Sequence, residues 1–428
     1  MSVTPRLAAL FIAAGLSVPA IAAPCLPSGA DVPPGANTTD PRKPFFIDTR
    51  GLDTTVSPPV RDPGKAGYPA ATHLADGVVP PVSGNGNFIL GASHEAAPET
   101  IPSDSVPHGR IVSFTMASAK ARVFNPGVVR DDPLNCPNGA VYAAPTAPGD
   151  PSDLKLATSH PGPWERSVDV YVPAQYVPGT PAPILVFGDG GADGFYNGRD
   201  LFTVLDALIA QKKLPPIVAI GIGSGGQDAQ GSERGREYDA VSPLYAEWVA
   251  QEVLPRAEKA ANIRITHDPD GRATMGVSSS GAAAFTMAWF HPDLFRRVLA
   301  YSPTFTNQQW PRDPNLPGGA WQYHDAWTGA GGGPGAARSL VKDTPAKPIR
   351  MWFEAGDQDL FYPAPNMPDG MHDWTLADER MAAALAAKGY AYQFVLSRGV
   401  GHVDRSTIAQ TLPEALLWLW HGYRPTGR

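Results

Sequence analysis

Three consecutive serines, Ser278 to Ser280, stand between a short apolar run and an alanine-rich stretch. This pattern predicts a strand-to-helix turn, where one hydroxyl is exposed above a sheet and only small neighbours fit. Ser278 fits best, because Gly276 lies two residues before it and Gly281 three residues after it. Ser280 departs from the G-x-S-x-G pattern, since it stands where the second glycine usually lies. The alternative for Ser279 and Ser280 is capping of the helix.

A serine hydroxyl becomes an effective nucleophile when a base accepts its proton. His402, in the sequence GVGHVD between the last expected strand and the last expected helix, is the candidate base, and His372 is its rival. The candidate acid is Asp359, which lies beyond the turn at Gly356; Asp357 is the alternative, but it is placed to bond local amides. A Ser-His-Asp arrangement of this kind performs acyl transfer.

An acyl-transfer site also needs hydrogen-bond donors for the oxyanion. We expect the backbone N–H of Ser279, directly after the nucleophile, and that of Gly191, in the loop that PILVFGDGG leads into. The alternative for GDGG is an ordinary turn. No metal or organic cofactor is required: the sequence contains no HExxH or comparable ligand set, and HDPDG at 267–271 is interpreted as a turn.

From Trp164 onward, apolar strand patterns alternate with helical patterns. The segment 166–173 alternates, as an antiparallel or edge strand does, whereas 183–190 and 216–223 are continuous apolar runs typical of buried parallel strands. Such alternation predicts a mostly parallel sheet covered by helices on both faces. The further expected strands are 272–277, 296–303, 348–357 and 391–399, and the expected helices are 200–213, 242–260, 280–290, 376–389 and 411–423.

The region from 24 to 163 is dense in Pro, Gly and Asp and has no long helical period. Short strands are expected at 109–118 and 121–127, which predicts a small, irregular β-rich appendage. A flexible linker is disfavoured because apolar residues are available for a core, namely Ile111, Phe114 and Phe124. The expected organisation is therefore a leader at 1–23, an appendage at 24–163 and a catalytic domain at 164–428, with an insertion at about 303–345.

Residues 1–23 have a charged start, an apolar stretch and a small-x-small cleavage pattern, which predicts a secretion signal and a secreted or periplasmic protein. In such a compartment Cys25 and Cys136 are expected to form a disulfide, with two unpaired thiols as the alternative. No later segment is long and apolar enough to predict a membrane span. The 428-residue chain has a net charge of −7 and no Lys/Arg run, which disfavours nucleic acid as a partner.

Several segments together resemble the putative esterase family, which includes enterochelin esterases, esterase D, bacterial feruloyl esterases and mycolyltransferases. The resemblance covers about 164–424 and rests on FGDGGADGFYNGRD, GVSSSGAAAFTMAWFHPDLFRRVLAYSPTF, WFEAGDQDL, RGVGH and LPEALLWLW. It implies an α/β-hydrolase fold, with Ser278 as nucleophile, Asp359 as acid and His402 as base. It also implies that the amides of Gly191 and Ser279 form the oxyanion hole.

The expected substrate is an ester of a small molecule or of a carbohydrate. The acyl group is expected to be either linked to a carbohydrate or aromatic. The insertion could form a lid whose aromatic side chains stack on such a group, although they could equally fasten the loop to the body. The candidate substrate-binding residues are Trp310, Trp321, Trp327 and His372. The alternatives are a siderophore trilactone esterase, an acyltransferase, a serine peptidase and a non-catalytic binding domain.

Overall fold

The computed structural model describes residues 45–48, 70–130, 156–191, 198–226, 232–308, 319–325, 339–361 and 371–425. Several features expected from the sequence lie outside these residues: the leader at 1–23, Cys25 and Cys136, and Trp310 and Trp327.

A ten-stranded sheet runs through the centre of the molecule in the order β2-β3-β15-β14-β13-β12-β9-β10-β7-β4. The eight strands from β2 to β10 are parallel, and β7 is antiparallel to both of its neighbours. The strands are β2 Ala71–His73, β3 Gly86–Leu90, β4 Arg110–Ala117, β7 Glu165–Val172, β9 Ile184–Gly188, β10 Val218–Ile222, β12 Arg272–Val277, β13 Arg297–Tyr301, β14 Arg350–Gly356 and β15 Ala391–Ser397.

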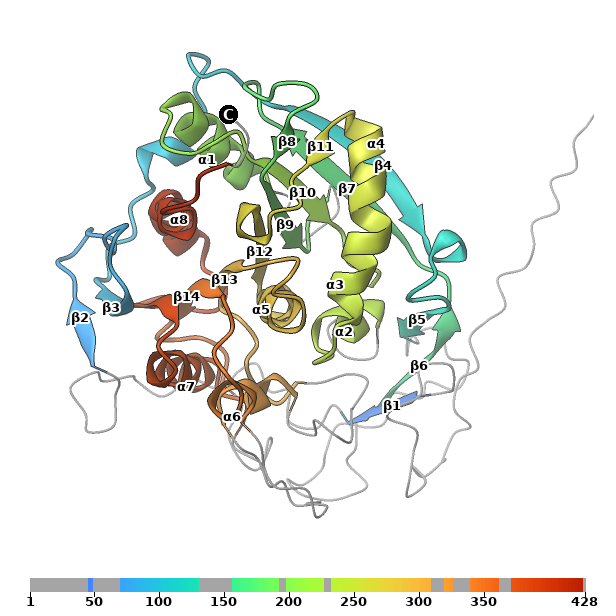
Figure 1. The fold of residues 1–428 in the computed structure, drawn as a ribbon. Helices are drawn as coiled ribbons and strands as arrows, with labels where there is room; N and C mark the ends of the chain where they lie inside the picture. The colour runs from blue at the N-terminus through green and yellow to red at the C-terminus, as the bar shows by residue number, and fades with distance from the viewer. Residues whose placement is uncertain are drawn as a thin grey trace, which may run out of the picture.

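Helices cover both faces of this sheet (Figure 1). Two helices, α1 Arg199–Ala210 and α8 Arg405–Leu419, share an apolar core with one face. The other face is covered by α2 Glu233–Tyr238, α3 Leu244–Trp248, α4 Leu254–Ala261, α5 Ser279–Phe290, α6 Leu340–Asp343 and α7 Trp374–Ala387. A π-helical turn, Val249–Val253, joins α3 to α4.

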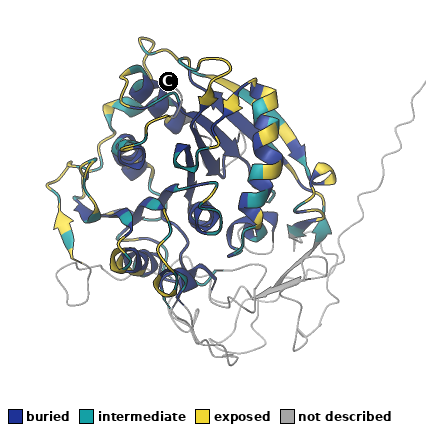
Figure 2. Cartoon of the chain, viewed as in Figure 1, coloured by how far each residue is buried: buried dark blue, intermediate teal, exposed yellow. Residues whose placement is uncertain are grey.

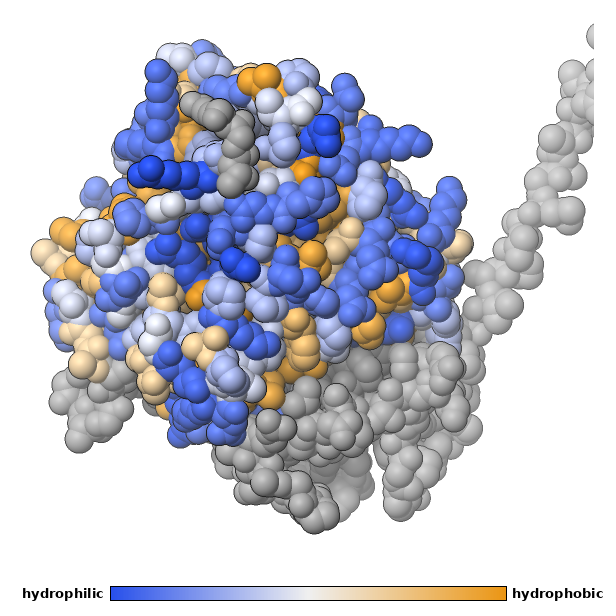
Figure 3. Space-filling model, viewed as in Figure 1, coloured by the Kyte–Doolittle hydropathy of each residue, from blue (hydrophilic) through white to orange (hydrophobic). Residues whose placement is uncertain are grey.

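The sheet and the inner sides of the helices are buried, while the outer side of α4 is exposed (Figure 2). The face seen in Figure 3 is largely hydrophilic, with apolar residues scattered over it. The apolar side chains of these elements are therefore directed to the two cores. This architecture is the α/β-hydrolase fold, as the sequence predicted.

The N-terminal region differs from the expected arrangement. It contributes β2 and β3 to one edge of the central sheet and β4 to the other. It also supplies a separate antiparallel sheet, β1-β6-β5, formed by Phe45–Asp48, Leu156–Gly162 and Gly127–Arg130. A boundary at 163/164 therefore does not separate the catalytic sheet from its first strands. The sequence pattern could not show this, because β4 pairs with a strand more than 45 residues away, Arg110 lying opposite Val172.

Helix α8 begins at Arg405, six residues before the expected start, and Pro413 lies inside it. The Asp404 side chain caps the helix by accepting the N–H of Thr407 at 2.9 Å. Proline has no N–H, so the Ala409 carbonyl four residues earlier loses its donor within the helix. The N–H of Ala97 donates to this carbonyl at 3.0 Å, which ties the N-terminal region to α8.

The remaining described elements are short. A two-stranded sheet joins β8 Pro181–Ala182 to β11 Arg264–Ile265, and single 3-10 turns occupy Pro98–Thr100, Ser118–Lys120, Pro269–Gly271 and Gly319–Tyr323. The Pro269–Gly271 turn is the HDPDG segment, where Asp268 accepts the N–H of Asp270 at 3.0 Å. None of the described helices is long and apolar enough to cross a membrane.

Candidate active site

Ser278 lies in a strained turn between β12 and α5, with φ 55° and ψ −126°. Residues other than glycine rarely adopt positive φ, so the surrounding structure must hold this conformation. The Ser278 N–H donates to the carbonyl of Tyr301 at 3.0 Å, at the end of the neighbouring strand β13. A Cβ at Gly276 would overlap the backbone of Ser280, so the turn requires glycine two residues before Ser278.

Ser280 fits this turn although it replaces the usual second glycine. Its Oγ accepts the N–H of Val277 at 2.9 Å and donates to the carbonyl of Val277 at 2.8 Å. The facing position on β9 is Gly188, where a Cβ would come within 2.7 Å of the Ser280 Cβ. A glycine on the adjacent strand therefore provides the space that the hydroxymethyl group occupies.

The structure brings Ser278, His402 and Asp359 together. Nε2 of His402 lies 2.8 Å from the Ser278 Oγ, and Nδ1 lies 2.6 Å from Oδ1 of Asp359. The imidazole is partly accessible, at 22% side-chain exposure, whereas the carboxylate is buried. The geometry allows the imidazole to accept the serine proton at one nitrogen while the carboxylate fixes the other.

Asp357 has a different position. Its Oδ1 accepts the N–H of Gly399 at 2.8 Å, so it ties the loop after β14 to the loop that carries His402. The two loops are also joined by the Gln358 N–H, which donates to the carbonyl of Val400 at 3.0 Å. A Cβ at Gly356 would overlap that same carbonyl, so glycine is needed for the two loops to approach.

The histidine loop is further fixed by its neighbours. Val403 has φ 52°, and its N–H donates to the Oγ of Ser302 at 2.9 Å. Trp374, the first residue of α7, meets the His402 ring edge-on with 6.0 Å between ring centroids. Its indole N–H donates at 3.2 Å to the Oγ1 of Thr304, which lies 3.4 Å from the Ser278 Oγ.

Two fully buried carboxyl groups, Glu354 on β14 and Asp378 on α7, lie in the electrostatic environment of Asp359. Burial raises the pKa of both well above the ordinary value, and the charge of Asp359 raises each further. Burial and the repulsion from Asp359 therefore both favour the neutral acid form of Glu354 and Asp378.

The two expected oxyanion donors follow neighbouring parallel strands. Ser279 opens α5 directly after β12, where a first-turn N–H has no acceptor within its own helix. Gly191 follows β9, which pairs with β12. It has φ 82°, and a Cβ there would overlap the Oγ of Ser167. Both amides therefore belong to the edge of the sheet at which Ser278 emerges.

Of the other predicted site residues, Trp310 and Trp327 lie outside the described chain, and Trp321 and His372 are buried. Trp321 is only 4% exposed and packs against His324 and Arg380, with 4.8 Å between the Trp321 and His324 ring centroids and 5.1 Å from the guanidinium carbon to the indole centroid. These contacts correspond to the alternative in which the aromatics fasten the loop. His372 is buried in the segment before α7, while the histidine on the Ser278 hydroxyl is His402.

Sequence reasoning did not identify Thr304, Trp374, Arg234 or Asp239, which pack around this edge of the sheet. Arg234 bonds both oxygens of Asp189, in the loop of Gly191, at 2.8 Å each. No local pattern marks these residues, because each is brought to the site by a contact between distant segments. For Thr304 the usable signal was its position directly after the expected strand 296–303.

Comparison with protein families gives one match, to the family described as Putative esterase, over residues 159–419. A search of curated proteins found no relative. Among solved structures, the enterochelin esterase of Shigella flexneri is 21% identical with a TM-score of 0.42, and the match covers 60% of this chain and 55% of that chain. This chain thus spans about half the length of that protein. A CE1 ferulic acid esterase of the anaerobic fungus Anaeromyces mucronatus is 12% identical with a TM-score of 0.46, covering 77% and 98%.

Proposed function

We propose that this chain, which belongs to the putative esterase family, hydrolyses carboxylic esters through a covalent acyl-serine intermediate. The observation that carries the proposal is the pair of hydrogen bonds that joins Ser278 to His402 at 2.8 Å and His402 to Asp359 at 2.6 Å. The strained backbone of Ser278 supports it, since such strain is typical of an exposed nucleophile at this turn.

In the first half-reaction, the Ser278 Oγ attacks the ester carbonyl carbon and its proton passes to Nε2 of His402. The negative charge that develops on the carbonyl oxygen would be stabilised by the amides of Ser279 and Gly191. Asp359 stabilises the imidazolium, which then donates its proton to the departing alkoxide. The alcohol leaves, and the acyl group remains on Ser278.

In the second half-reaction, a water molecule occupies the place of the alcohol. His402 accepts a proton from this water, and the resulting hydroxide attacks the acyl carbonyl. Collapse of the tetrahedral intermediate breaks the bond to Ser278, whose oxygen recovers the proton from His402. The products are a carboxylic acid and the free enzyme.

The substrate that we propose is a carbohydrate-linked or aromatic acyl ester, met outside the cytoplasm. The leader pattern at 1–23 supports the location, and the aromatic-rich insertion at about 303–345 supports an aromatic or sugar substrate.

The test is turnover of p-nitrophenyl acetate, methyl ferulate, an acetylated xylan oligosaccharide and a catecholate trilactone by the wild type and Ser278→Ala. We expect ester turnover that falls at least about 10⁴-fold in the variant, together with fluorophosphonate labelling of the wild type alone. Amide substrates and added alcohol acceptors in the same assay distinguish a peptidase or transferase. Equal turnover by the two proteins would remove the proposed mechanism.

A further inference from the structure

The short helix α2, Glu233–Tyr238, packs against α5, the helix that begins at Ser279 (Figure 1). It has an unusual composition for a buried helix, because four of its six residues are glutamate or arginine. Five of its six residues are nonetheless buried, including Arg234 and Tyr238. Their polar groups are directed at specific partners in the loop after β9.

That loop is held by two residues of α2. Asp189, the first residue after β9, has φ 53°, an uncommon conformation for aspartate. Arg234 donates from Nε and Nη2 to the two carboxylate oxygens of Asp189, each at 2.8 Å. The N–H of Asp189 donates to the Tyr238 hydroxyl at 3.0 Å. The side chain and backbone of this residue are therefore both fixed, two positions before Gly191.

The same helix also reaches the other donor residue. Asp239, which ends α2, is 3% exposed and its Oδ2 accepts a hydrogen bond from Nε2 of Gln308 at 3.1 Å. Nε2 of Gln308 also donates to the Oγ of Ser279 at 3.2 Å. A chain of hydrogen bonds therefore leads from the end of α2 to the residue whose amide is the second donor.

A second set of contacts, made by the two glutamates of α2, holds the helix in place. The buried side chain of Glu237 pairs with Arg166, whose guanidinium carbon lies 3.9 Å from the ring centroid of Trp164 and 4.6 Å from that of Trp248. Glu233 accepts the N–H of Val128 at 2.8 Å. Ser167, next to Arg166, is the residue against which Gly191 lies. Strand β7 thus carries both Arg166, which pairs with α2, and Ser167, which contacts the loop of Gly191.

We propose that α2 is a positioning element for the oxyanion hole and that Arg234 is its principal positioning residue. The proposal rests on the esterase function proposed above and adds a residue to it. A bidentate guanidinium–carboxylate pair fixes both distance and direction, so it can hold the Gly191 amide where the transition-state oxygen forms. A preformed hole avoids reorganisation during the reaction.

The expected effect falls on kcat. Removing one oxyanion donor typically lowers kcat about 10²–10³-fold, so displacing a donor without removing it should lower kcat by about 10–100-fold. Arg234→Gln should show this loss with KM changed by less than about threefold. Arg234→Lys should recover little of it, because one ammonium group cannot replace the two parallel hydrogen bonds.

A matched pair of tyrosine variants separates positioning from stability. Tyr238→Phe removes the acceptor of the Asp189 N–H, and Tyr171→Phe removes a hydroxyl that donates to Asp206 at 2.6 Å. Both side chains are buried, but Tyr171 lies opposite Ala219, near the start of β10, at the other edge of the sheet. Tyr238→Phe should lower kcat about tenfold, whereas Tyr171→Phe should lower Tm and leave kcat unchanged.

The measurement is kcat and KM on a p-nitrophenyl ester, with the inhibition constant of a boronic acid that forms a tetrahedral adduct on serine. Inhibitor affinity should fall across the variants in proportion to kcat/KM. If the wild type is active and both Arg234→Gln and Tyr238→Phe keep its kcat, the positioning role is wrong while the esterase function stands. If the wild type turns over no ester, both proposals fail, since there is no oxyanion to position.

Discussion

The residues at the carboxyl ends of the central strands differ in kind from those at the amino ends. We call these two ends of the parallel strands the carboxyl edge and the amino edge of the sheet. At the carboxyl edge, the first residue beyond each of three neighbouring strands, β9, β12 and β13, has positive φ: Asp189 at 53°, Ser278 at 55° and Ser302 at 46°. At the amino edge, the first residue of each of three neighbouring strands, β12, β13 and β14, is an arginine: Arg272, Arg297 and Arg350.

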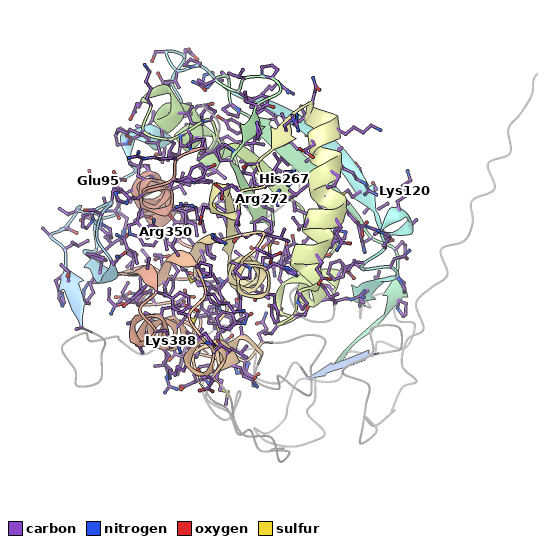
Figure 4. The ribbon with its side chains drawn as sticks, in the orientation of Figure 1. Glu95, Lys120, His267, Arg272, Arg350 and Lys388 are labelled. Atoms are coloured by element: carbon purple, nitrogen blue, oxygen red, sulfur yellow. The ribbon has the colours of Figure 1, made fainter. Side chains whose placement is uncertain are left out.

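The arginines satisfy backbone groups. Nε of Arg272 donates to the carbonyl of Thr266 at 2.6 Å, Arg297 donates to the carbonyl of Leu419 at the end of α8, and Nη1 of Arg350 donates to that of His421 at 2.9 Å. Figure 4 shows Arg272 and Arg350 on the side of the molecule where these strands begin. Burial lowers the pKa of all three guanidinium groups, that of Arg350 to about 10.

The difference indicates that the two edges have different roles, one in catalysis and one in stability. Positive φ costs about 1–2 kcal/mol for each residue other than glycine, and it occurs at the carboxyl edge, where the hydroxyl and imidazole meet. At the amino edge, Arg297 and Arg350 donate to carbonyls at the end of α8 or just after it, and positive charge favours a helix C-terminus. Changes at the first edge should therefore alter catalysis, and changes at the second should alter stability.

The largest effect is expected at the carboxyl edge, from Asp359→Asn. The amide cannot stabilise the imidazolium and favours the wrong tautomer, so kcat should fall by about 10³–10⁴-fold. Asp357→Asn is the matched control: it changes a carboxylate that accepts the Gly399 N–H and should change kcat less than about fivefold. Steady-state kinetics measures kcat of both variants. A larger loss of kcat in Asp357→Asn than in Asp359→Asn would assign the role of the acid to Asp357 instead.

A smaller effect is expected at the amino edge, from Arg297→Met. The variant removes donors to the carbonyls of Leu419 and Asp270 and should lower the free energy of unfolding by about 1–3 kcal/mol, with kcat unchanged. Its neighbour provides the control: Arg296 forms a partly exposed ion pair with Asp270 at 3.1 Å, so Arg296→Gln should cost less than about 1 kcal/mol. Urea denaturation and kcat would be measured for both, and a loss of kcat in Arg297→Met would contradict this difference in roles.

The smallest effect is a pH dependence at the carboxyl edge. Burial raises the pKa of Asp239 to about 7. In the unfolded state this carboxyl group loses its proton near its ordinary pKa of 3.8, whereas in the folded state it keeps the proton up to about pH 7. The stability that the neutral form contributes is therefore fully present below about pH 4 and is lost as pH rises through about 7. Between pH 5 and 8, Tm of the wild type should fall relative to Tm of Asp239→Asn. Thermal scans across this range test it, and parallel curves would contradict it.

That Ser278, His402 and Asp359, the proposed nucleophile, base and acid, lie close together could be expected from the sequence because parallel strands end at a common edge. Knowing which strands precede Ser278, Asp359 and His402 is therefore enough to expect them near one another. The sequence also predicted most of the strands and helices after Trp164, since long apolar runs and helical periods are strong local signals.

The unpredicted parts depend on contacts that local patterns do not carry. The charged sequence ERGREY of α2 is typical of a solvated segment, yet the structure buries it. Arg234 pairs with Asp189 in the loop after β9, and Glu237 pairs with Arg166 on β7. The first turns of α8 were missed because Pro413 normally lies near the start of a helix. The N–H that Pro413 lacks is replaced by that of Ala97, which donates to the Ala409 carbonyl from more than 300 residues away.

The outer strands set a lower limit on how far the protein can be trimmed for recombinant work. A version reduced to the family-matched region 159–419 would lack β2, β3 and β4, and the flanks of β7 and β15 would then present unsatisfied amides and carbonyls to solvent. Uncovered strands of this kind pair with one another between molecules. Such a shortened protein should accumulate as insoluble material even though every residue of the proposed triad is retained.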